Sequence, residues 1–170
     1  MYQINVICII LVVLLVAIFD LTGAYYIKVC DVKPDFFLIA VLFFSLYGGL
    51  RGGLWSGFIS GLVKDIFIGE VFGMNILFLT LAGLFFGYNF SKFYRERPSA
   101  QFILTFLLSV VYILFYYNFL KLTHYASGSI PADARIWPLL LPVGVSFSLY
   151  TAVAAPFFFF IFRNMFRLSH

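Results

Sequence analysis

The chain has 170 residues, of which 64% are hydrophobic and 11% are charged, and its formal net charge is +4. A soluble domain carries about 25% charged and about 45–50% apolar residues. A soluble fold of this length cannot hide so much apolar surface, because a small core leaves much of the chain exposed. The composition therefore predicts an integral membrane protein. Basic residues scattered between apolar blocks are typical of the ends of membrane spans, so nucleic-acid binding is not expected.

Six apolar blocks follow one another and predict an all-α membrane protein, one bundle of about six transmembrane helices that forms a single domain over residues 1–170. The predicted spans are about 4–27, 36–50, 53–68, 71–90, 102–120 and 137–162. A span needs roughly 17–25 mostly apolar residues. The second and third blocks are short, and only Arg51 and Gly52 separate them. They form either two tilted spans or one re-entrant hairpin that other helices bury.

The distribution of basic residues predicts the orientation of the chain. The loop after the fourth block contains Lys92, Arg95 and Arg97, and the C-terminal end adds Arg163 and Arg167. Loops rich in Lys and Arg stay on the cytoplasmic side of a membrane. We therefore expect both termini to be cytoplasmic.

Glycines recur every four residues through the second and third blocks, at Gly49, Gly53, Gly57 and Gly61. Residues four apart lie on one face of a helix. Small residues on that face let another backbone approach closely, which supports helix association in lipid. Gly53, Gly57 and Gly61 therefore predict a contact face, either for another helix of this chain or for a partner.

Polar residues from distant parts of the chain map to the outer end of the predicted bundle. They are Asp20, Asp35, Asp65, Glu70 and Asn75. They predict either a polar outer rim that docks a partner or a set of independently solvated interface residues. Lys64 precedes Asp65, but adjacent residues of a helix do not face each other, so a salt bridge between them is not expected.

No catalytic or cofactor-binding pattern is present in the sequence. His124 and His170 are isolated, and Cys8 and Cys30 flank the first block without further ligands nearby. Neither a phosphate loop nor a hydrolase or metalloprotease motif occurs. We expect no enzyme activity, no cofactor and no metal.

The stretch from Pro34-Asp35 through the glycine-rich GGLWSGFISGLVKDIFIGEVFGMN to LAGLFFGYNF resembles the MreD family. The matching positions are Pro34, Asp35, Gly53, Gly57, Gly61, Leu62, Asp65, Gly69, Gly73, Gly83 and Gly87. The resemblance implies a non-catalytic scaffold in the bacterial inner membrane. It also implies a place in the rod complex (elongasome), which supports cell shape and lateral peptidoglycan synthesis. The implied partners are MreC first, then MreB, RodA and a class B transpeptidase.

A second function class stays open at this point. Substrate-binding components of energy-coupling-factor vitamin transporters are also six-helix membrane proteins of similar size, and they bind ligand near the outer side. Their first span often carries an Ala-x-x-x-Ala surface, whereas the first block here reads INVICIILVVLLVAIFD. This departure favours the scaffold over the transporter subunit.

Overall fold

The computed structural model describes residues 6–22, 33–67, 71–89, 97–126 and 137–166. Every regular element in these ranges is a helix, as predicted. The helices are α1 (Val6–Thr22), α2 (Phe36–Phe67), α3 (Met74–Asn89), α4 (Pro98–Ala126) and α5 (Trp137–Met165). Segments of three of them are long and apolar enough to cross a membrane: Phe36–Phe67, Pro98–Thr123 and Val143–Met165. Two shorter apolar helices accompany them, Val6–Asp20 and Met74–Asn89.

α2 is a helical hairpin and not a straight rod. Gly49 has a φ of 62° and a ψ of −151°, which breaks the helical geometry at that residue. A left-handed φ is easy for glycine, which has no Cβ, and costly for other residues. Beyond the break the chain runs back along itself, so that the Gly52 backbone packs against the Phe44 carbonyl. α2 therefore consists of two antiparallel arms, residues 36–48 and 50–67.

The hairpin refines two expectations. The break between the second and third apolar blocks lies at Gly49, inside the predicted second block, whereas the sequence analysis separated the blocks at Arg51 and Gly52, which are already helical. The first arm is shorter than the roughly 17–25 residues that a membrane crossing needs, and the second arm reaches only the lower end of that range. α4 also starts earlier and ends later than the predicted span 102–120. Within the described ranges, the six separate spans expected from hydropathy correspond to five helices, one of them folded double.

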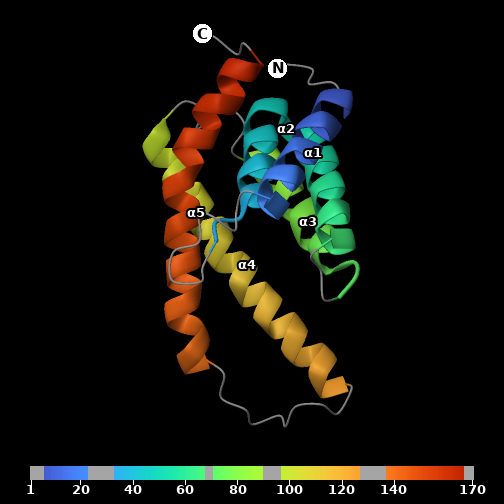
Figure 1. The fold of residues 1–170 in the computed structure, drawn as a ribbon, viewed down its shortest axis with the longest axis vertical. Coiled ribbons are helices and arrows are strands. Elements are labelled where there is room, and N and C mark those ends of the chain that lie inside the picture. The colour runs from blue at the N-terminus through green and yellow to red at the C-terminus, as the bar shows by residue number, and fades with distance from the viewer. Residues whose placement is uncertain (1–5, 23–32, 68–70, 90–96, 127–136, 167–170) are drawn as a thin grey trace.

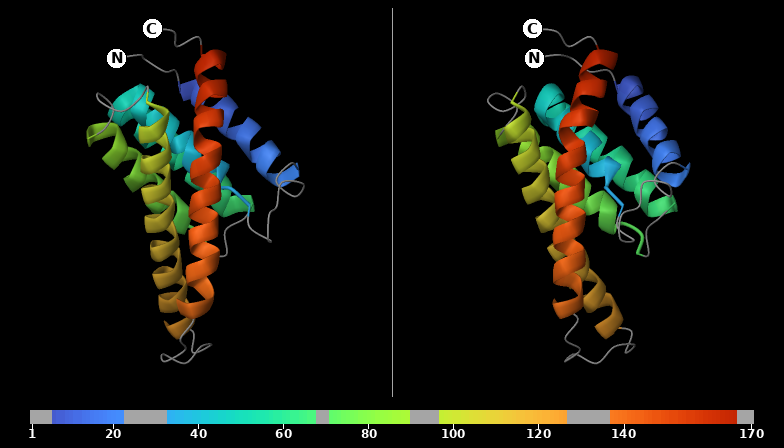
Figure 2. Two further views of the ribbon diagram at one scale, coloured as in Figure 1. Left: turned by 90° about the vertical axis from the view of Figure 1, so that its left-hand side faces the viewer. Right: turned by 60° about the vertical axis from the view of Figure 1, so that its left-hand side comes forward.

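The first arm of α2 forms the centre of the molecule, and all of its residues from Phe36 to Gly49 are buried. Aromatic rings of this arm pack against α1 and α5. Phe36 contacts Phe19 of α1 and Phe158 of α5, with ring centroids 5.1 and 4.8 Å apart. Higher up, Phe43 meets Phe159 of α5 at 5.4 Å. α1 and α5 thus cover the central arm, while the second arm pairs with α3 (Figures 1 and 2).

The helices reach to different depths. α1, both arms of α2 and α3 form a short body beside the upper halves of α4 and α5 (Figure 1). α4 and α5 each contain 29 residues, or about 43 Å of helix at 1.5 Å per residue. They continue below the short body as a separate pair (Figures 1 and 2). The upper end of the molecule is therefore wide and its lower end is a two-helix stem.

The second arm of α2 and α3 approach each other through backbone atoms. A Cβ built on Gly53 would lie 2.0 Å from the Gly83 carbonyl oxygen, and one on Gly57 would lie 2.3 Å from the Leu79 carbonyl oxygen. The same test at Gly61 meets the Ile76 Cα at 2.4 Å. Real Cβ atoms do not come so close, so these positions admit only glycine at this spacing. The glycine face predicted from the sequence is covered by α3.

This packing makes Gly57→Ala a sensitive test of the α2–α3 contact. Overpacking a tight contact costs about 1–3 kcal/mol, and we expect that loss in the free energy of unfolding in mixed micelles, followed by tryptophan fluorescence. Gly144→Ala is the matched control, because the new methyl group would meet only the Ile113 side chain, at 3.3 Å, which can move. Equal stability of the two variants would contradict the close backbone contact.

Candidate functional site

Asp35 stands at the start of α2 and fixes the first turn of the central arm. Its Oδ1 accepts hydrogen bonds from the backbone N–H groups of Phe37 and Leu38, at 3.1 and 3.2 Å. An aspartate at this position satisfies amide groups that the helix itself leaves without partners. The Asp35 N–H in turn donates to Thr151 Oγ1 of α5, at 3.2 Å. The residue thus begins α2 and ties it to α5.

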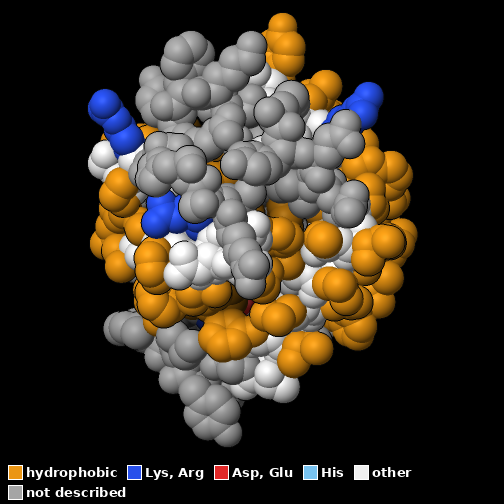
Figure 3. Space-filling model, turned by 90° about the horizontal axis from the view of Figure 1, so that it is seen from above, with side chains coloured by type: hydrophobic (Ala, Val, Ile, Leu, Met, Phe, Trp, Pro, Cys, Tyr) orange, Lys and Arg blue, Asp and Glu red, His pale blue; other side chains and the backbone are white. Residues whose placement is uncertain are grey.

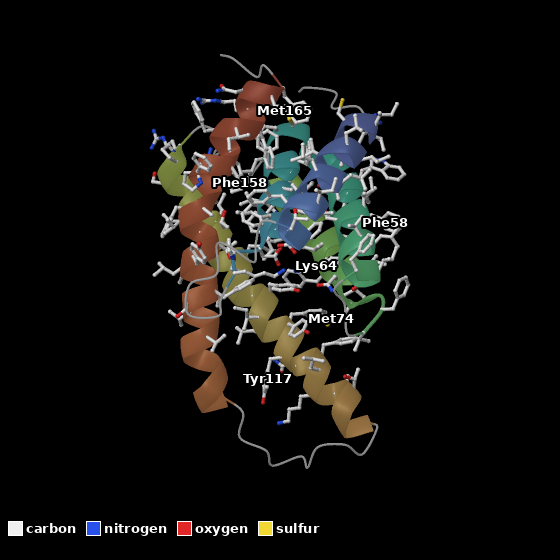
Figure 4. All side chains as sticks on the ribbon, in the orientation of Figure 1. Phe58, Lys64, Met74, Tyr117, Phe158 and Met165 are labelled. Atoms are coloured by element: carbon white, nitrogen blue, oxygen red, sulfur yellow. The ribbon has the colours of Figure 1, made fainter. Side chains whose placement is uncertain are left out.

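Lys64, near the end of the second arm, makes a salt bridge through its Nζ with Asp35 Oδ2. The two side chains are only 10% and 5% exposed. The residues are 29 positions apart, and a straight helix would separate them by about 43 Å. The ion pair therefore closes the open end of the hairpin opposite Gly49. Figure 4 shows Lys64 in the interior, at the lower end of the short body.

Tyr112 of α4 lies beside this ion pair. Lys64 Nζ is 4.3 Å from the centroid of the Tyr112 ring, a distance at which the ring face attracts a cation. The Tyr112 hydroxyl donates to Asn75 Oδ1 of α3, at 2.8 Å. One aromatic side chain therefore connects the hairpin, α3 and α4.

Asp65 organises the turn from α2 into α3. Its Oδ1 accepts from the Asn75 backbone N–H and side-chain amide, at 3.1 and 2.8 Å. Its Oδ2 accepts from the N–H groups of Gly73 and Ile76, both at 3.0 Å. Asp65 thus caps α3 from a neighbouring helix, and its negative charge lies at the helix end where it is favourable. Gly73 makes this turn with a φ of 96°.

Asp20 adds a second ion pair at the end of α1. Its Oδ2 lies 2.9 Å from Lys33 Nζ, with the aspartate side chain 4% exposed and the lysine side chain 38% exposed. Lys33 and Asp35 flank Pro34 on the segment that enters the central arm. The pair therefore joins α1 to the start of α2.

We call the set Asp20, Lys33, Asp35, Lys64, Asp65, Asn75 and Tyr112 the polar network. Four of the five residues of the predicted outer rim belong to it, and Glu70 lies outside the described residues. These four side chains are buried and bonded to other parts of the chain, and do not form an exposed rim. Burial requires such bonding, because an unpaired charge away from water is costly.

Four residues of this arrangement were not predicted as site residues: the network members Lys33, Lys64 and Tyr112, and Thr151, which binds Asp35. Lys64 carried a usable signal, since a lysine inside an apolar block needs an opposite charge nearby. Tyr112 and Thr151 carried none, because each looks like an ordinary residue of an apolar helix. In the predicted basic loop, Arg97 is exposed at the start of α4, while Lys92 and Arg95 lie outside the described residues.

The carboxylates of the network are already engaged in hydrogen bonds and ion pairs within the chain, which limits their binding of other groups. The carboxylates of Asp35 and Asp65 accept from backbone N–H groups and from side chains within the chain. In the described part of the chain no group of three or more His, Cys, Asp or Glu side chains is placed to hold a metal ion. The arrangement is suited to holding α1, α2, α3 and α4 together at one level.

The fold and the network define an all-helical membrane protein with a buried polar centre. A family model described as rod shape-determining protein MreD matches residues 1–167. The chain therefore belongs to the MreD family, and is a membrane protein of the complex that determines rod cell shape. No curated protein and no solved structure matches it. The expected likeness to energy-coupling-factor components, and with it the transporter alternative, is not supported.

A double-mutant cycle tests the ion pair. Lys64→Met leaves a buried carboxylate without its cation, which costs about 3–5 kcal/mol in unfolding free energy. Asp35→Asn keeps an amide oxygen for the α2 cap, so the double variant Asp35→Asn/Lys64→Met should be more stable than Lys64→Met alone. Lys121→Met, which removes an exposed lysine of α4, is the control and should change stability little. Additive losses in the double variant would show that the two residues are not coupled.

Proposed function

We propose that this chain is a non-catalytic scaffold of the rod complex in the bacterial inner membrane, and that it supports lateral peptidoglycan synthesis by binding MreC. The match to the MreD family over residues 1–167 carries this proposal. The network supports it as well, because its acid and amide groups are engaged in joining helices. The partners in the wider complex are MreB, RodA and a class B transpeptidase.

In this proposal the predicted glycine face and the two aspartates stabilise the fold and do not contact the partner. The glycine face of Gly53, Gly57 and Gly61 packs on α3, and Asp35 and Asp65 lie inside the network. We assign these residues to keeping the scaffold rigid, so that their loss would weaken assembly through the fold. The surface that contacts MreC must then lie elsewhere on the chain.

An apolar groove between α3 and α4 is our candidate for that surface. The groove has a volume of about 510 Å³. Its walls are Phe78, Leu81, Ala82, Phe85, Phe86, Leu104, Leu107, Leu108, Val111 and Phe115. All of these side chains are hydrophobic, and a hollow of this kind between two helices can hold a single membrane helix, such as that of the bitopic protein MreC, through close packing. Leu81 and Leu107 are 59% and 52% exposed there, so they are available for contact.

Charge supports an orientation with the wide end of the molecule in the cytoplasm. The tip of the α2 hairpin, the start of α4 and the end of α5 share this end (Figure 1), and they carry Arg51, Arg97 and Arg163. Seen from above, Lys and Arg side chains stand among hydrophobic ones on this face (Figure 3). Basic residues concentrate on the cytoplasmic side of membrane proteins. In this orientation Arg97 would face MreB.

Co-purification of MreC from mild detergent tests the groove. Leu107→Trp fills the space between α3 and α4, and we expect at least a several-fold drop in recovered MreC, by analogy with the cost of a clash at an interface core. Leu149→Trp on α5 is the matched control, since that leucine is 50% exposed and does not line the groove. Unchanged recovery with Leu107→Trp would exclude the groove. Absence of MreC with the unmodified chain would contradict the scaffold proposal itself.

A further inference from the structure

A second hollow lies at the wide end, between the start of α4, the last turns of α5 and the top of the central arm. It has a volume of about 230 Å³. Its walls combine three polar side chains with apolar ones, and they are Tyr47, Pro98, Gln101, Pro156, Phe159, Phe160 and Arg163. The groove proposed for MreC shares none of these residues. The hollow is therefore a separate site from the groove.

The polar side of this hollow is formed by Arg163, Gln101 and Tyr47. Arg163 is half-buried, and its guanidinium carbon lies 5.8 Å from the centroid of the Phe160 ring, which holds it against the wall. Both salt bridges found among the described residues involve lysines at the level of the network, so no described carboxylate neutralises Arg163. Gln101 and Tyr47 are only 6% and 4% exposed. A guanidinium that faces a hollow and has no described carboxylate partner is suited to a phosphate group.

The apolar side of the hollow continues into the outer surface of α5. Phe160, Phe157 and Val153 are 54%, 64% and 60% exposed. They recur at spacings of three and four residues, so they form one stripe on the helix. A ligand with a phosphate at Arg163 and hydrocarbon along this stripe would contact both surfaces at once.

We propose that this hollow binds the phosphate of an anionic lipid headgroup, with the acyl chains lying along Val153, Phe157 and Phe160. The tip of the α2 hairpin and the start of α4 also lie at the wide end (Figure 1), and Arg51 and Arg97 belong to these segments. Basic hollows between membrane helices on the cytoplasmic side are suited to anionic headgroups. The site is independent of MreC, and it would bind lipid on the isolated chain.

Native mass spectrometry of the full chain, freed of lipid in detergent, tests this site with phosphatidylglycerol and with zwitterionic phosphatidylethanolamine as probes. We expect preferential binding of phosphatidylglycerol. Arg163→Gln should weaken that binding about tenfold, the size of one charge-assisted hydrogen bond. Arg163→Lys should retain most of it, which separates the charge from the packing of the side chain.

Arg51→Gln is the matched control, because Arg51 is an exposed arginine at the same end that does not line the hollow. Its affinity for phosphatidylglycerol should stay within about twofold of the unmodified chain, as for a solvated surface charge. Equal weakening by Arg51→Gln and Arg163→Gln, or weakening by neither, would overturn the site. Displacement of the lipid by an equal concentration of inorganic phosphate would overturn the lipid as the source of the phosphate. Since no MreC is present, none of these results depends on the scaffold proposal.

Discussion

The buried ion pair between Asp35 and Lys64 is the interaction on which the rest of the fold depends. It closes a hairpin whose other end is the turn at Gly49, so both ends of the central arm are fixed in relation to the second arm. Asp35 also caps the central arm and binds α5, and Lys64 touches the ring that connects α4 to α3. In a membrane there is little hydrophobic force to bring helices together. Specific polar contacts and close packing must therefore select the arrangement.

Glycine supplies the close packing. The second arm of α2 and α3 touch through backbone atoms at Gly53, Gly57 and Gly61. This spacing brings Asp65 within hydrogen-bonding distance of three amides at the start of α3. The glycine contact and the polar network therefore depend on each other, since a wider separation of the two helices would move Asp65 away from the amides that it caps. The glycine repeat and Asp65, which follows it at the same spacing, therefore form one structural unit.

Local features of the fold could be predicted from the sequence, whereas contacts between distant segments could not. Hydropathy located the apolar blocks, and the glycine repeat indicated a close helix contact. The carboxylates were expected at one level. Their bonding could not be predicted in full, because Tyr112 and Thr151 approach the network from α4 and α5. The turn of the α2 hairpin lies at Gly49, and the sequence alone could not locate it there for a similar reason. Four glycines surround Arg51, and only the packing of the two arms decides which of them takes a left-handed φ.

The unequal depths of the helices have a consequence for the lipid around this protein. A bilayer that surrounds the chain meets long helices on the side of α4 and α5, and short ones on the side of α1 and α3. Hydrocarbon about 30 Å thick must thin where it borders a shorter apolar surface, at a cost of fractions of a kcal/mol per Å. That cost falls when two such short flanks share one thinned patch. The shape of the chain therefore gives neighbouring membrane proteins with short helices a reason to gather on one side of it, without direct contact between them.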